Sequence, residues 1–164
     1  MLRSIWLICK HVRIVIIHKT WVAYYIALVI VKLLSRAIFH DMSKLRIDEI
    51  RGFSKLTTGY GSCRYDSPEY KARHKVLSET LKLHYERNSH HPEHYNGDVT
   101  KMDIIDIAEM VCDWKAAVHY AHGDIKESIR IQKVKYRLEG QLLDYITSLT
   151  DISKAEAELV RLGK

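Results

Sequence analysis

The stretch WVAYYIALVIVKLLSRAIF, from Trp21 to Phe39, carries the strongest structural signal in this chain of 164 residues. It is apolar nearly all round a helix, which is typical of a helix at the centre of a fold. Residues 2–18 show apolar side chains at helical spacing and predict a helix before it. Further helices are predicted at residues 41–56, 68–89, 100–120, 125–149 and 153–162. Because no long strand-like alternation occurs, the sequence predicts an all-α fold, a single-domain bundle of about six to seven helices.

The apolar N-terminal region is expected to be buried rather than inserted in a membrane. Its longest uncharged stretch, residues 20–31, has 12 residues, whereas a transmembrane helix needs roughly 20. No small-residue cleavage site follows a short apolar core, which argues against a signal peptide. The sequence therefore predicts two buried helices, no membrane span and a cytoplasmic protein.

Charge and cysteine content narrow the classes of function. The net charge is +6, but the basic residues are scattered and no run of Lys and Arg reaches five. A basic rim around a site for a small anionic substrate explains this balance as well as a nucleic-acid surface does, and no stable nucleic-acid complex is expected. The three cysteines are odd in number and far apart, which indicates a reducing compartment and no disulfide framework. Cys112 is expected to pack in a core.

The dipeptide His40-Asp41 is the first candidate for chemistry. Consecutive helical residues project about 100° apart, so the pair could offer a nitrogen and an oxygen to one ion. Imidazole with carboxylate suits Mn, Fe, Co, Ni or Zn. The alternative is a capping aspartate beside a core histidine. Lys44 lies three residues after Asp41 and could hold a substrate phosphate, or could form only a surface ion pair.

Histidines and a carboxylate further along the chain extend this pattern. His84, Asn88 and His91 fall at i, i+4 and i+7, so they share a helix face, and His90 is adjacent. They could bind a second metal or a substrate phosphate, and the alternative is a histidine-rich solvent loop. Asp113 sits among apolar residues, where a carboxylate is more often buried and partnered than solvated. No glycine-rich phosphate loop, nucleophile elbow or His-Glu-x-x-His motif is present.

In combination these residues resemble the HD-domain superfamily of metal-dependent phosphohydrolases. His18 matches the leading histidine, His40-Asp41 the defining doublet and Asp113 the closing aspartate. The chain is more closely similar to an uncharacterised bacterial and phage family of this pattern (DUF5662). That match consists of His18-Lys19, His40-Asp-Met-Ser-Lys44 with Glu49, His84-x-x-x-Asn88-x-His90-His91, and Glu109-Met-Val-x-Asp113-Trp114. The resemblance covers roughly residues 11–121 and implies an HD-like helical core, with residues 124–164 as C-terminal helices.

The resemblance also implies a function and a set of site residues. It implies a cytoplasmic phosphohydrolase, in a bacterium or a phage-infected host, acting on a nucleotide or another small phosphate ester. One or two divalent transition-metal ions would be held by His18, His40, Asp41, His84, His90, His91 and Asp113. The catalytic candidates are Asp41, Lys44 and Glu49, of which Glu49 could orient a ligand or the water. The substrate-binding candidates are Lys44, Arg46, Arg87 and Asn88.

Two other functions stay open at this point. Extra histidines between the doublet and the final aspartate also occur in di-iron oxygenases of the same superfamily, so the resemblance allows an HD-type oxygenase. A non-catalytic binding protein stabilised by metal is the alternative outside enzymes. A homo-oligomer is compatible with either.

Overall fold

The computed structural model describes residues 2–55 and 67–151. In these residues it contains seven α-helices, three short 3-10 helices and no strand. The predicted all-α class is therefore confirmed. The chain divides into two compact units, Met1–His40 and Asp41–Lys164, each described by itself below. The helix predicted at residues 153–162 lies outside the described residues.

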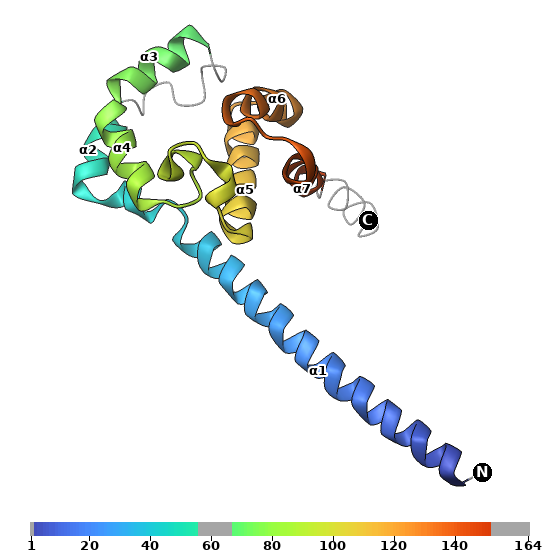
Figure 1. The fold of residues 1–164 in the computed structure, drawn as a ribbon. Helices are drawn as coiled ribbons and strands as arrows, with labels where there is room; N and C mark the ends of the chain where they lie inside the picture. Colours follow the sequence, from blue (N-terminus) through green and yellow to red (C-terminus); the bar gives the residue numbers. More distant parts are fainter. Residues whose placement is uncertain (1, 56–66, 152–164) are drawn as a thin grey trace, which may run out of the picture. The chain divides into compact units, whose positions relative to one another are not determined.

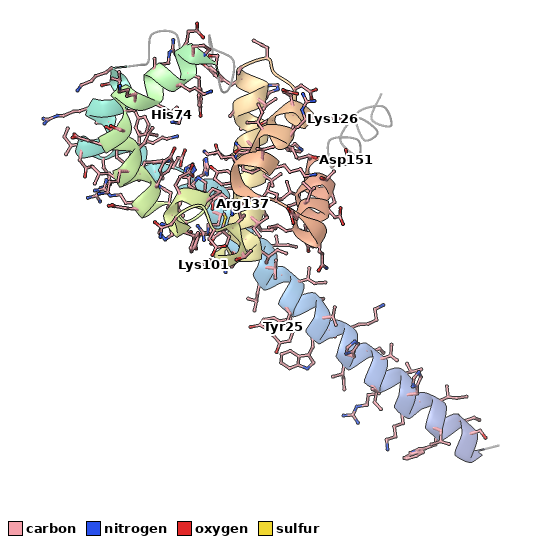
Figure 2. All side chains as sticks on the ribbon, turned by 45° about the horizontal axis from the view of Figure 1, so that its top comes forward. Tyr25, His74, Lys101, Lys126, Arg137 and Asp151 are labelled. Atoms are coloured by element: carbon pink, nitrogen blue, oxygen red, sulfur yellow. The ribbon has the colours of Figure 1, made fainter. Side chains whose placement is uncertain are left out.

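The described residues of the first unit form one helix, α1 (Leu2–Phe39), drawn in blue in Figure 1. The prediction of two separate helices is wrong, because no glycine or proline interrupts residues 18–21. Instead the Thr20 hydroxyl donates to the carbonyl of Ile16 (3.0 Å), within continuous helix. The predicted burial is also wrong, since large apolar side chains along α1 are exposed, including Tyr25, which Figure 2 labels.

The second unit contains the remaining elements. They are η1 (Met42–Leu45), α2 (Ile47–Ser54), α3 (Pro68–Val76), α4 (Ser78–Arg87), η2 (Pro92–Tyr95), η3 (Val99–Lys101), α5 (Ile104–Tyr120), α6 (Ile125–Tyr136) and α7 (Gly140–Thr150). Its hydrophobic core forms where α5 packs on α6 and α7. The buried members are Val99, Met102, Ile107, Met110, Val111, Trp114, Leu138 and Ile146. Cys112 is not part of this core and is exposed, contrary to the sequence-based expectation.

Left-handed residues break two of the predicted helices. Asp41 has φ 54° at the start of the helix predicted at 41–56, and Arg46, which is extended (φ −72°, ψ 146°), then divides the rest into η1 and α2. Arg137, labelled in Figure 2, has φ 53° and ends α6, and Gly140 has φ 54° at the start of α7. Local periodicity does not reveal such turns when the residues around them keep a helical pattern.

The remaining helix boundaries also differ from the expected ones. The helix expected at 68–89 divides at Leu77 into α3 and α4. The helix expected from residue 100 begins at Ile104, because the Asp103 carboxylate caps it by accepting from the amides of Ile105 and Asp106 (both 2.8 Å).

The contact between α2 and α4 brings one wall of the candidate site together. Gly52 is buried against Thr80, and a methyl group at Gly52 would lie 2.0 Å from the Thr80 hydroxyl oxygen. Only glycine allows the two helices to approach this closely. The close approach lets Glu49 on α2 reach His84 on α4 (3.0 Å).

Candidate metal centre

Four side chains from two segments of the second unit converge on one point. Asp41 comes from the turn before η1, His84 from the last turn of α4, and His90 and His91 from the loop that follows α4. Ligand atoms of Asp41, His90 and His91 all lie within 4.8 Å of one another. His84 and His90 are each only 1% exposed, so the cluster is part of the interior and not a histidine-rich solvent loop.

The distances between the donor atoms match the spacing of ligands around a single ion. Oδ1 of Asp41 lies 3.3 Å from Nε2 of His84 and 3.5 Å from Nε2 of His90. Nε2 of His84 lies 2.9 Å from Nε2 of His91. Donors that bind one transition metal, each at about 2.0–2.2 Å, lie roughly 3–3.5 Å from one another. The residues present therefore fit a divalent transition metal.

The backbone of Asp41 explains how its carboxylate reaches the histidines. Its left-handed conformation (φ 54°, ψ 18°) is one that aspartate tolerates better than most residues. The carboxylate makes no cap to the amides of η1. One oxygen instead accepts from Nζ of Lys44 (2.6 Å) and the other faces His84 and His90. Strained backbone of this kind concentrates at functional sites.

A carboxylate lies behind each of the two buried histidines. Oε2 of Glu49 lies 3.0 Å from Nδ1 of His84, and Oε1 of Glu109 lies 3.3 Å from Nδ1 of His90. A carboxylate at Nδ1 favours the tautomer that carries its proton there, which leaves the Nε2 lone pair for a metal. Both Nε2 atoms are the ones that face Asp41.

Glu49 is fully buried at 0% exposure and is held by several donors. Arg87 donates to Oε1 (2.6 Å) and the Ser43 hydroxyl donates to Oε2 (2.9 Å). Burial raises the pKa of Glu49, but the hydrogen bonds from Arg87, His84 and Ser43 outweigh burial and hold this pKa below its ordinary value. Glu49 is therefore ionised at neutral pH, as a carboxylate that orients His84 must be.

His91 is uncharged at neutral pH in this environment. Burial lowers its pKa to about 3, and the nearby His90 and His84 act in the same direction, whereas Asp113 and Asp41 oppose them. A neutral imidazole is the form that binds a metal.

Asp113 also reaches the cluster. One of its carboxylate oxygens lies within 4.8 Å of a ring nitrogen of His90. It stands one helical turn after Glu109 on α5, so both carboxylates share the face of α5 that meets His90. Asp106 on the same helix is 3% exposed and Glu109 is 9% exposed, so the carboxylates of α5 are not simply a solvated acidic face.

Lys44 supplies a cation at the more open edge of the cluster. Its side chain is 38% exposed, its Nζ contacts Asp41 (2.6 Å), and the same atom lies 5.4 Å from the ring centroid of Phe53. The ring and the carboxylate hold the ammonium close to the candidate metal ligands.

Within the first unit, His18 lies far from His40, the other predicted ligand of that unit. It is an exposed residue within α1, and His40 follows that helix directly. At a rise of 1.5 Å per residue, a continuous helix separates the two by roughly 30 Å. One ion cannot bind both in this conformation. His40 is the last residue of the first unit, one peptide bond before Asp41.

The other predicted residues near the cluster make contacts within the protein. Glu49 lies behind His84, so it is a positioning residue, which is one of the roles predicted for it. Arg87 bonds to Asp48 and Glu49, and Asn88 donates to the Ser43 hydroxyl (2.7 Å), so both support the buried histidine. Bonds within the protein engage two of the five N–H donors of Arg87 and the side-chain amide of Asn88. The predicted role of these two residues in binding a phosphate stays a prediction.

The sequence analysis did not predict the roles of Ser43 and Glu109, and the structure places the predicted residue Arg46 away from the cluster. Ser43 bonds to Glu49 and lies 3.1 Å from Nδ1 of His84, while Glu109 supports His90. The spacing of Glu109 from Asp113 (i, i+4) was the available signal for the latter. Arg46, predicted to bind substrate, is 63% exposed and pairs with Asp48 at 3.7 Å.

Comparison with known proteins gives a family but no function. The model of a family of unknown function (DUF5662) matches residues 8–152. No curated protein and no solved structure matches the chain.

Proposed function

Because the chain belongs to DUF5662, a family of unknown function, we propose its activity from the candidate site: it is a metal-dependent phosphohydrolase of the HD type. The observation that carries the proposal is the arrangement around Asp41. One carboxylate oxygen faces Nε2 of His84 and His90, and the other accepts from Lys44. The side chain of Asp41 thus contacts both the candidate metal-binding histidines and a lysine that can attract an anionic substrate.

The metal would be held by residues of the second unit that already lie at ligand spacing. These are Asp41, His84, His90, His91 and Asp113. His40 stays a predicted ligand on the ground that it precedes Asp41 in the chain. A bound divalent ion supplies a Lewis acid and lowers the pKa of a coordinated water toward neutrality.

The other residues would perform three tasks. Glu49 and Glu109 orient the imidazoles of His84 and His90 through Nδ1, which keeps both Nε2 atoms directed at the ion. Asp41 holds Lys44 close to the site. Lys44 stabilises the negative charge that develops on the phosphoryl oxygens.

Lys44 offers a cation to an anionic substrate, which suits a phosphate ester. An oxygenase that acts on an anionic substrate would use the same cation, so the bound metal and the product distinguish the two functions. A nucleotide or another small phosphate ester is the substrate class that the resemblance implies.

The test begins with metal content and continues with activity. The purified chain should contain a divalent transition metal by mass spectrometry and should release phosphate from members of a nucleotide panel when supplied with Mn, Co, Ni, Zn or Mg. Asp41→Asn should lose both metal and phosphate release while its circular dichroism stays helical. Asp144→Asn, a change of the same kind at an exposed position on α7, should lose neither.

Two results would overturn the proposal. One is a coloured, oxygen-sensitive iron protein that releases no phosphate, which would indicate an oxygenase. The other is phosphate release that survives in Asp41→Asn.

A further inference from the structure

Helix α1 exposes an apolar surface that the first unit cannot bury. The described residues of that unit form a single helix, and one helix without a second element has no core of its own. Its large apolar side chains are exposed along its length, for example Ile5 at 51% and Ile26 at 54%. Apolar surface of this extent marks an interaction site.

The length of the apolar stretch matches the thickness of a bilayer. By length and composition the segment Ser4–Leu45 contains a helix able to cross a membrane. Between Arg13 and Arg36, the only charged residues are Lys19 and Lys32. This stretch, residues 14–35, extends about 33 Å at 1.5 Å per residue, against a hydrocarbon core of about 30 Å. Both lysines lie within about five residues of its ends, so their ammonium groups can reach the headgroups.

The distribution of polarity favours a helix that crosses the bilayer over one that lies on its surface. Residues 20–31 form more than three helical turns with no charged side chain on any side. A helix bound in the plane of the interface needs a polar face along its length. A helix that is apolar all round is stable only when surrounded by apolar material.

The charge of the first unit points to lipid rather than to a second copy of the chain. Its Lys and Arg residues are Arg3, Lys10, Arg13, Lys19, Lys32 and Arg36, and it contains no Asp or Glu. The whole chain has 26 basic and 20 acidic residues, so residues 41–164 balance at 20 of each. All of the net charge of +6 therefore resides on α1. Cations near helix ends are attracted to anionic headgroups, whereas two copies of α1 would repel each other.

We infer that α1 inserts into a lipid bilayer as a single transmembrane span over residues 14–35. The expectation of no membrane span assumed two buried helices, and α1 is one exposed helix. The requirement for an unbroken uncharged stretch was also too strict, because Lys19 and Lys32 lie near the ends of the span. This inference does not depend on the phosphohydrolase activity.

The first experiment tests insertion with a matched pair of variants. The full chain, purified in detergent, is reconstituted with vesicles of equal parts phosphatidylcholine and phosphatidylglycerol, floated on a density gradient and washed with alkaline carbonate. Ile26→Arg places a charge near the centre of the span, and Ile5→Arg makes the same change, at similar exposure, outside it. Wild type and Ile5→Arg should stay with the vesicles, while Ile26→Arg should fall at least about tenfold.

The second experiment distinguishes a crossing helix from a surface helix. Cys9 precedes the span and Cys112 follows it, and both are exposed. In a Cys63→Ser background, a membrane-impermeant maleimide should add once to each chain in sealed vesicles and twice after detergent, as read by intact mass. Both orientations of the chain in the bilayer give this same result, because every inserted chain presents one cysteine to each side.

Three outcomes would overturn the inference. Chains with two adducts in sealed vesicles would place α1 on the surface. Equal flotation of Ile26→Arg and Ile5→Arg would show that the apolar centre is not inserted. A stable dimer in detergent-free buffer that does not associate with vesicles would identify a second copy of the chain as the partner of α1.

Discussion

Replacing Glu49 by glutamine should weaken metal binding and destabilise the fold, although the two side chains have almost the same shape. Glu49 is fully buried and accepts hydrogen bonds from Arg87 and Ser43 while one of its oxygens lies 3.0 Å from Nδ1 of His84. Glutamine keeps one acceptor and adds a donor, so either His84 or Arg87 must face an amide hydrogen. Losing a charge-assisted bond in the interior costs about 2–4 kcal/mol of unfolding free energy.

The effect on metal affinity follows from the same contact. Without the carboxylate, the tautomer of His84 with Nε2 directed at the ion is no longer favoured. Loss of such a partner lowers metal affinity by roughly 10–100-fold. Isothermal titration with Zn or Mn measures the dissociation constant, and urea unfolding of the metal-free protein measures stability.

Asp48→Asn is the matched control. Asp48 also accepts from Arg87, but its side chain is 37% exposed, and no contact of Asp48 with a histidine is recorded among the described residues. This control should lose little stability, because an exposed ion pair contributes little, and should bind metal as wild type does. An unchanged metal dissociation constant in Glu49→Gln would refute the assignment of Glu49 as the residue that positions His84.

Three further predictions concern other parts of the second unit. Gly52→Ala should destabilise the protein by about 1–3 kcal/mol in thermal unfolding. Alanine normally favours a helix, but here its methyl group would clash with the Thr80 hydroxyl, so Thr80→Gly in the same chain should recover most of the loss. Lys44→Met should lower phosphate release at least about tenfold with metal content unchanged, whereas the same change at the exposed Lys55 should have no effect. The pKa of His91 is lowered from 6.5 to about 3, so between these pH values the unfolded chain binds a proton at His91 and the folded protein does not. With chelator present, the stability due to His91 should be full above pH 6.5 and fall by up to about 1.4 kcal/mol per pH unit below it, and His91→Gln should flatten that slope.

The candidate ligands could be recognised from the sequence because their chemistry is carried by residue type and short spacing. His40-Asp41, His84 and the pair His90-His91 stand out as groups that bind metals, and Asp113 stands out because its neighbours are apolar. The positions of Ser43 and Glu109 behind the histidines could not be recognised in this way. Ser43 and His84 are 41 residues apart and meet because η1, which carries Ser43, packs against α4.

The sequence by itself determined that the chain is helical and which side chains could bind a metal, because both depend on local pattern and residue chemistry. Only the tertiary structure decided that Asp41 turns left-handed, that Glu49 supports a histidine, and that residues 2–39 form one exposed helix and not a buried pair. An apolar pattern states that a helix must be surrounded by apolar material, but it is the same pattern whether that material is protein or lipid. Contacts between distant segments are set by packing, which no local window of the chain contains.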